Sequence, residues 1–103
     1  MNTGFAKYTG KISGKVTDQK TGKTLPGTNI LIIGRNMGAA SDTNGLYTIS
    51  NVPPGSYSVQ ARMLWHESVT VRNVIVVTDS ITIINFQLSP VEIKHEGVRL
   101  GPK

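Results

Sequence analysis

The fold of this chain is decided between residues 41 and 59, where the sequence reads SDTNGLYTISNVPPGSYSV. The Asn44-Gly45 pair can supply the positive φ angles of a hairpin turn, and a short strand over residues 46–50 follows it. Pro53-Pro54-Gly55 ends that strand, and a longer one begins directly after it. Two tight turns, each followed by alternating apolar and polar residues, predict a small β-sandwich.

The same alternation extends to both sides of this stretch. The strands we predict are residues 11–18, 28–33, 39–42, 46–50, 56–65, 69–77 and 81–88. Ile12, Gly14 and Val16 share the inward face of the first strand, and Arg72-Asn73 interrupts the sixth, which predicts a bulge or a bend there. Seven short strands with no room for parallel crossovers predict an all-β, seven-stranded antiparallel Greek-key sandwich.

Length and composition set the limits of the fold. The chain has 103 residues and no cysteine, so it is expected to form one domain without disulfides or thiolate metal sites. We expect a flexible lead-in over residues 1–9, the sandwich domain over residues 10–89 and a linker or tail over residues 90–103. No run of roughly 20 apolar residues is present, so this piece is not expected to span a membrane.

The net charge is +5, and five lysines between residues 7 and 23 account for much of it. Lys11 and Lys15 fall on the polar face of the first predicted strand. We interpret them as a solvated face that discourages pairing between strand edges, with an anionic partner as the alternative. Nucleic acid is not expected as a partner, because no aromatic residues are interleaved with these lysines.

Catalytic and metal-binding patterns are weak. The two histidines are His66 and His95. Ser68 lies close to His66 and Glu67 in sequence, but neighbouring residues of a strand point to opposite faces, so this closeness does not make a catalytic triad. A zinc site would need three or four ligands. The run from Asp42 to Gly45 resembles part of a calcium loop, but its side chains are better explained as hydrogen-bonding their own turn. We therefore expect neither an enzyme nor a bound cofactor or metal.

Trp65 is the sole tryptophan, and it has two interpretations. It can continue the inward register of Tyr57, Val59, Ala61 and Met63 and cap the core, which is the interpretation the pattern favours. Alternatively, it forms an aromatic platform for a sugar or a peptide. Separately, Leu31, Ile33 and Leu64 would form an apolar patch for a neighbouring domain if they face outward.

Five pieces of sequence in the right order resemble the carboxypeptidase regulatory-like family. They are Gly14-Lys15-Val16-Thr17-Asp18 with Thr21-Gly22, Leu25-Pro26-Gly27-Thr28-Asn29-Ile30, Asp42 to Ile49, Val52 to Val59, and Asn73-Val74 with Asn85-Phe86-Gln87-Leu88. The resemblance covers roughly residues 10–89. It implies a transthyretin-like sandwich grouped among carbohydrate-binding-like folds.

The resemblance also implies a function that involves no catalysis. Such domains accompany metallocarboxypeptidases and stand at the N-terminus of TonB-dependent outer-membrane receptors, and residues 5–12 resemble the receptor context more closely. We therefore expect a periplasmic accessory domain of an outer-membrane receptor that contacts other domains of its parent or a periplasmic protein. The alternatives are a carbohydrate-binding module and an extracellular folding-support domain of a secreted carboxypeptidase.

Candidate contact residues follow from these interpretations. They are Trp65, His66, Arg62, Lys11 and Lys15. One departure from the family bears on this set, because Trp65-His66 stands where such domains often carry a glycine-tyrosine pair.

Overall fold

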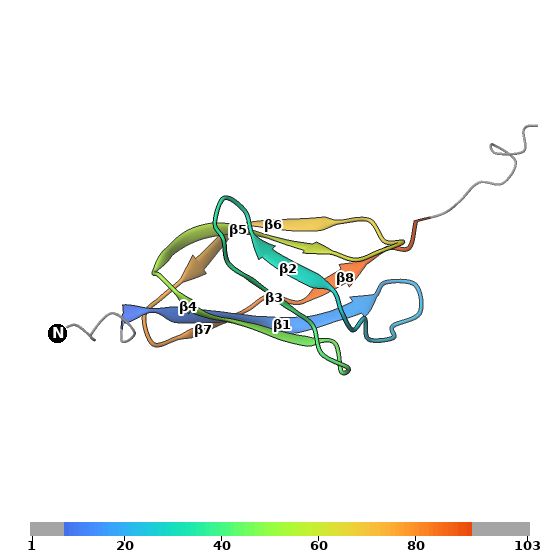
Figure 1. Cartoon of the computed structure of the whole chain (residues 1–103), viewed down its shortest axis with the longest axis horizontal. Coiled ribbons are helices and arrows are strands. Elements are labelled where there is room, and N and C mark those ends of the chain that lie inside the picture. Colours follow the sequence, from blue (N-terminus) through green and yellow to red (C-terminus); the bar gives the residue numbers. More distant parts are fainter. Residues whose placement is uncertain (1–7, 92–103) are drawn as a thin grey trace, which may run out of the picture.

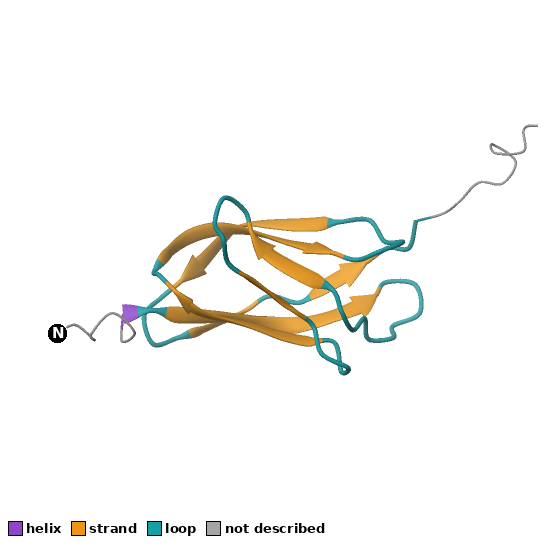
Figure 2. Cartoon of the chain, viewed as in Figure 1, coloured by secondary structure: helices purple, strands orange, loops and turns teal. Residues whose placement is uncertain are grey.

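Two β-sheets packed face to face form the protein in the computed structural model, which describes residues 8–91 (Figure 1). The first sheet contains β4 (Leu46–Val52), β1 (Gly10–Asp18) and β7 (Ile81–Ile83) in that order, and β8 (Phe86–Leu88) also pairs with β1. The second sheet has the order β3 (Gly38–Ala40), β2 (Asn29–Ile32), β5 (Gly55–Arg62) and β6 (Val69–Val76). Loops connect the two layers of strands (Figure 2).

The core lies between the two sheets and uses the inward face of each strand. On β1, Ile12, Gly14 and Val16 are buried while Lys11 and Lys15 are exposed, as the alternation predicts. The buried apolar residues are Ile12, Val16, Ile30, Ile32, Tyr47, Ile49, Val52, Val59, Ala61, Val74, Val76, Phe86 and Leu88. Burial of these β-branched and aromatic side chains is the main force that holds the sheets together.

The predicted all-β sandwich is confirmed, but it has eight strands and not seven. The run over residues 81–88 divides between β7 and β8, because the backbone leaves the ladder at Ile84-Asn85. The Asn85 side-chain oxygen accepts a hydrogen bond from the Lys15 N–H at 2.9 Å. It thereby replaces the backbone carbonyl that an unbroken strand would offer to β1.

The direction of the last strands also differs from the prediction. β7 and β8 run parallel to β1, whereas β4 pairs with β1 antiparallel, so the first sheet is mixed. Sequence spacing alone gave no sign of this, because the segments that pair lie about 70 residues apart in the chain. As a result, the described chain enters the sandwich at one end and leaves at the other, here called the N-terminal and C-terminal poles (Figure 1).

The two turns that identified the fold do not close hairpins. Asn44-Gly45 joins β3 to β4, and Pro53-Pro54 joins β4 to β5, and in both cases the two strands belong to different sheets. Gly45 has a φ of 78°, whereas Asn44 does not adopt a positive φ. The Asp42 carboxylate accepts hydrogen bonds from the N–H groups of Asn44 and Leu46, so the prediction that Asp42 stabilises its own turn is confirmed.

The bulge expected at Arg72-Asn73 is confirmed. Tyr57 pairs with Val74 and Val59 pairs with Val71, so two steps along β5 match three along β6. Asn73 has a φ of 58°, which an asparagine tolerates better than most residues. The lead-in and the tail expected over residues 1–9 and 90–103 lie mostly outside the described residues, as does His95, and those boundaries stay predictions.

Candidate interaction surface

The loop between β5 and β6, residues 63–68, lies at the C-terminal pole and is here called the pole loop. A tight turn begins it, in which the His66 N–H donates to the Met63 carbonyl at 3.1 Å. The outgoing chain pairs with the same loop: the Glu67 N–H donates to the Ser89 carbonyl at 2.9 Å, and the Val91 N–H donates to the Trp65 carbonyl at 2.8 Å. The pole loop is therefore fixed to the segment through which the chain leaves the domain.

A histidine–aspartate pair fixes the pole loop to the end of β1. His66 Nε2 lies 2.9 Å from Asp18 Oδ2, and His66 Nδ1 lies 2.9 Å from the Leu64 carbonyl oxygen. The two side chains are only 11% and 13% exposed. Both partners of the ring are hydrogen-bond acceptors, so the two contacts together require a doubly protonated, cationic imidazole.

The electrostatics of this pair agree with that geometry. The hydrogen bond to the Leu64 carbonyl, followed by the one to Asp18, raises the pKa of His66 above its usual 6.5. The hydrogen bond from His66, supported by the N–H of Thr21, lowers the pKa of Asp18 below its usual 3.8. The hydrogen bonds of the His66 ring thus hold the pole loop against the end of β1, and both ring nitrogens already have partners within the protein. The pair of His66 and Asp18 is here called the latch.

Trp65 does not cap the core, and the expectation that it would is wrong. Its side chain is 63% exposed and its backbone φ is 64°. The strand β5 ends at Arg62, so the inward register stops before it reaches Trp65. The turn at Met63–His66 then places Trp65 in the left-handed region, where a non-glycine residue costs roughly 1–2 kcal/mol. A glycine in this position would carry no such strain.

A groove of about 660 Å³ lies beside Trp65 on the outer side of the second sheet. Its lining residues are Asn29, Leu31, Arg62, Met63, Leu64, Trp65, His66 and Ser68. Leu64 is 72% exposed, and Leu31 is partly exposed on the neighbouring strand β2. The outward exposure expected of Leu64 and Ile33 is therefore observed, although Ile33 does not line the groove.

The structure divides the five candidate contact residues between the two faces of the sandwich. Arg62, Trp65 and His66 line the groove. Lys11 and Lys15 are exposed on the outer side of the first sheet, opposite Ile81 and Leu46 in the strand ladders. The two lysines do not line the groove, and the roles of all five residues in contact stay predictions. The sequence did not indicate Asn29 or Leu31 as neighbours of Trp65, because only the pairing of β2 with β5 brings them there.

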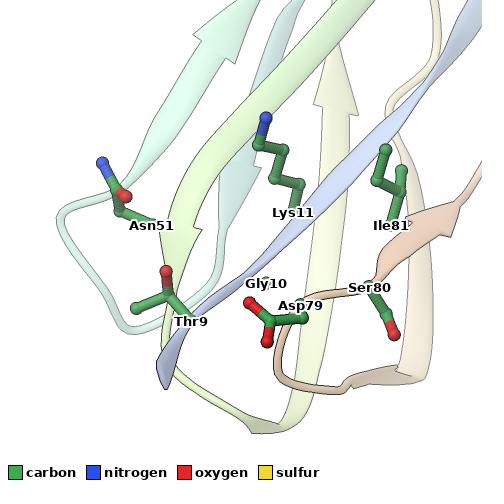
Figure 3. Close-up of a pocket in the computed structure, with 7 residues that line it drawn as sticks. All are labelled: Thr9, Gly10, Lys11, Asn51, Asp79, Ser80 and Ile81. Atoms are coloured by element: carbon green, nitrogen blue, oxygen red, sulfur yellow. The ribbon is translucent and has the colours of Figure 1, made fainter. Parts of the chain in front are cut away.

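A second, smaller cavity of about 310 Å³ lies at the N-terminal pole (Figure 3). Its lining residues are Thr9, Gly10, Lys11, Asn51, Asp79, Ser80 and Ile81. The parallel pairing of β1 with β7 and the antiparallel pairing of β1 with the end of β4 bring these three segments together, which no local sequence signal could show. Its walls combine one ammonium group, one carboxylate and an isoleucine, without an aromatic side chain.

Within residues 8–91, no group of three or more histidine, cysteine or acidic residues is placed to hold a metal ion. The same residues include no helix with the length and apolar character needed to cross a bilayer.

These features define a class, a β-sandwich domain with an exposed groove of mixed apolar and polar lining at one pole. Its family follows from the sequence. The model of the carboxypeptidase regulatory-like domain matches residues 11–89, and the chain belongs to this family. No curated protein matches the chain in sequence.

Solved structures agree on the fold. A chain of a type II cohesin–X-dockerin complex from Acetivibrio cellulolyticus matches with a TM-score of 0.63 and 24% identity, over 80% of this chain and 55% of that one. A putative carbohydrate-binding protein from Bacteroides uniformis matches with a TM-score of 0.59 and 17% identity, over 78% and 41%. The minor pilin GBS52 of Streptococcus agalactiae matches with a TM-score of 0.60 and 14% identity, over 86% and 48%. The chain therefore spans about half the length of these proteins, and the likeness shows the fold alone.

Proposed function

We propose that this domain is a non-enzymatic interaction module that contacts protein through the groove beside Trp65. The observation that carries the proposal is an exposed tryptophan at a backbone position that disfavours it. Trp65 gains little from burial, so its strain is explained best by a contact made outside the domain. Tryptophan, arginine and methionine are enriched at protein interfaces, and all three line this groove.

The proposal extends to the setting of the domain. We assign it to the periplasm, as the N-terminal accessory domain of a TonB-dependent outer-membrane receptor. The family supports this setting, because such domains accompany those receptors as well as secreted peptidases. The similar cohesin–X-dockerin chain, whose structure is that of a complex, supports protein contact as the mode of action.

Reading the gene beyond Lys103 tests the setting. A receptor sequence downstream is the expected result. A peptidase downstream would contradict the receptor assignment and favour the folding-support role instead.

Photo-crosslinking in the native cells tests the contact itself. A benzoylphenylalanine in place of Leu64 should form adducts with polypeptide on irradiation. The matched control carries the same group in place of Ile83, which is 60% exposed on β7 in the other sheet. Adducts no more abundant at residue 64 than at residue 83 would overturn the proposal.

Carbohydrate binding is the second candidate, and one observation favours it. Trp65 is exposed beside the polar side chains of Arg62 and Asn29, and a pyranose ring could stack on the indole while these groups bind its hydroxyls. The aliphatic residues Leu31 and Leu64 favour protein over sugar. Titration of a glycan panel against the fluorescence of the sole tryptophan decides between them, and a flat response removes the sugar.

A further inference from the structure

We infer that the groove beside Trp65 binds in cis, to the stretch of the same polypeptide that follows Val91. This inference rests on the proposed function and names the partner of that site. Three observations carry it: the position of the outgoing chain, the small size of the groove and its charge.

The outgoing chain leaves the domain beside the backbone of the pole loop, whose residues Trp65 and His66 line the groove. The Val91 N–H donates to the carbonyl of Trp65, and the bridge between His66 and Pro90 lies one residue away. Val91 is itself 45% exposed next to this contact. The segment after Val91 therefore starts next to the backbone of Trp65, a residue that lines the groove.

The groove is small for a partner that arrives from solution. Eight residues line it, whereas a stable interface between separate proteins uses roughly 20–30 residues a side. A tethered partner is present at an effective concentration of about millimolar when its linker is short. A contact of this size is then enough to keep the tethered segment in place, although it would be weak between separate molecules.

The charge of the groove selects the chemistry of the partner. Arg62 has no ion-pair partner among residues 8–91, and no aspartate or glutamate lines the groove. Asp18 already neutralises His66. The groove therefore suits a segment that offers a carboxylate to Arg62 and aliphatic side chains to Leu31, Leu64 and Trp65. The sequence after Val91 offers carboxylates at Glu92 and Glu96 and aliphatic side chains at Ile93, Val98 and Leu100, alongside the cationic residues Lys94, Arg99 and Lys103.

Crosslinking within the purified parent protein tests the inference. Benzoylphenylalanine replaces Leu64, or Ile83 as the control, and the adducts are mapped by mass spectrometry. An equal mixture of ¹⁵N-labelled and unlabelled protein separates crosslinks within one chain from crosslinks between copies. We expect adducts from residue 64 to residues beyond Val91 of the same chain, several-fold more abundant than those from residue 83. Trp65→Gly in the same background should reduce them several-fold.

Each outcome decides between the two proposals. Adducts mainly between labelled and unlabelled chains would overturn the cis inference and leave a protein contact. Adducts to another protein in cells, with none in the purified protein, would do the same. If residue 64 gives no adduct above residue 83 in either setting, both the inference and the proposed contact function are overturned.

Discussion

Two positions in this domain, Gly14 and Trp65, follow opposite rules. At Gly14 a Cβ atom would lie 1.8 Å from the Ile84 carbonyl oxygen, so the packing of β1 against the β7–β8 break admits only glycine. At Trp65 the backbone favours glycine, with a φ of 64°, yet the chain carries its largest side chain there. At position 14 the residue is the one that the packing requires, whereas at position 65 the residue is not the one that the backbone conformation favours. The comparison indicates that Gly14 serves folding, whereas the residue at position 65 is explained by the contact that we propose.

The largest effect on stability is expected from a substitution of Gly14, where β1 packs against the break between β7 and β8. Gly14→Ala forces the new methyl group into a backbone carbonyl that cannot swing away, and we expect a loss of about 3 kcal/mol or more. The measurement is urea unfolding followed by circular dichroism. Gly22→Ala is the control, because its Cβ meets nothing within 4 Å and only its φ of 78° opposes the change. Equal losses in the two variants would show that steric crowding is not what distinguishes Gly14.

A smaller effect on stability is expected at Tyr47, whose hydroxyl contacts the same Ile84 carbonyl. The buried phenol donates to the Ile84 carbonyl at 2.6 Å, and burial raises its pKa, so it stays a donor. Tyr47→Phe removes this donor and should cost about 1–2 kcal/mol. Thermal unfolding measures it, with Tyr57→Phe as the half-buried comparison on the second sheet. An unchanged melting temperature for Tyr47→Phe would mean that water replaces the hydroxyl.

Trp65→Gly should separate stability from contact. Relief of left-handed strain of about 1–2 kcal/mol is partly offset by the greater freedom of glycine in the unfolded chain, so stability should stay equal or rise by up to about 1 kcal/mol. The same variant should lose the crosslinks at the groove. Leu64→Ala is the matched variant, which removes apolar surface without changing the backbone. A clear loss of stability in Trp65→Gly would show that the indole supports the fold.

The smallest effect is expected from the latch of the pole loop. His66, with its raised pKa, contributes stability that is complete below pH 6.5 and is lost as the pH rises through the raised value. Asp18, with its lowered pKa, contributes above pH 3.8 and loses this as the pH falls through the lowered value. The latch should therefore be strongest between these limits. Urea midpoints of the wild type and His66→Gln should converge as the pH rises through the raised pKa of His66, and a constant difference up to pH 9 would contradict the latch.

Local chemistry made most of the fold predictable. Alternation in β1 located its buried face, and the interruption at Arg72-Asn73 located the bulge, because both depend on neighbouring residues only. The break at Ile84-Asn85 was not predictable, since the Asn85 side chain finds its partner on Lys15, 70 residues away. The sequence pattern wrongly predicted a buried Trp65, because the alternation does not show that β5 ends at Arg62. The end of β5 is set by the turn that begins the pole loop.

By itself, the sequence determined the all-β sandwich, the family and the turns, because alternation, proline, glycine and asparagine act over a few residues. The tertiary structure alone decided that β7 and β8 run parallel to β1, that both turns cross between sheets, and that Trp65 faces outward beside the outgoing chain. The physical reason is the range of the forces involved. Turn chemistry is local, whereas the choice of strand partner depends on which distant segments together bury the most apolar surface.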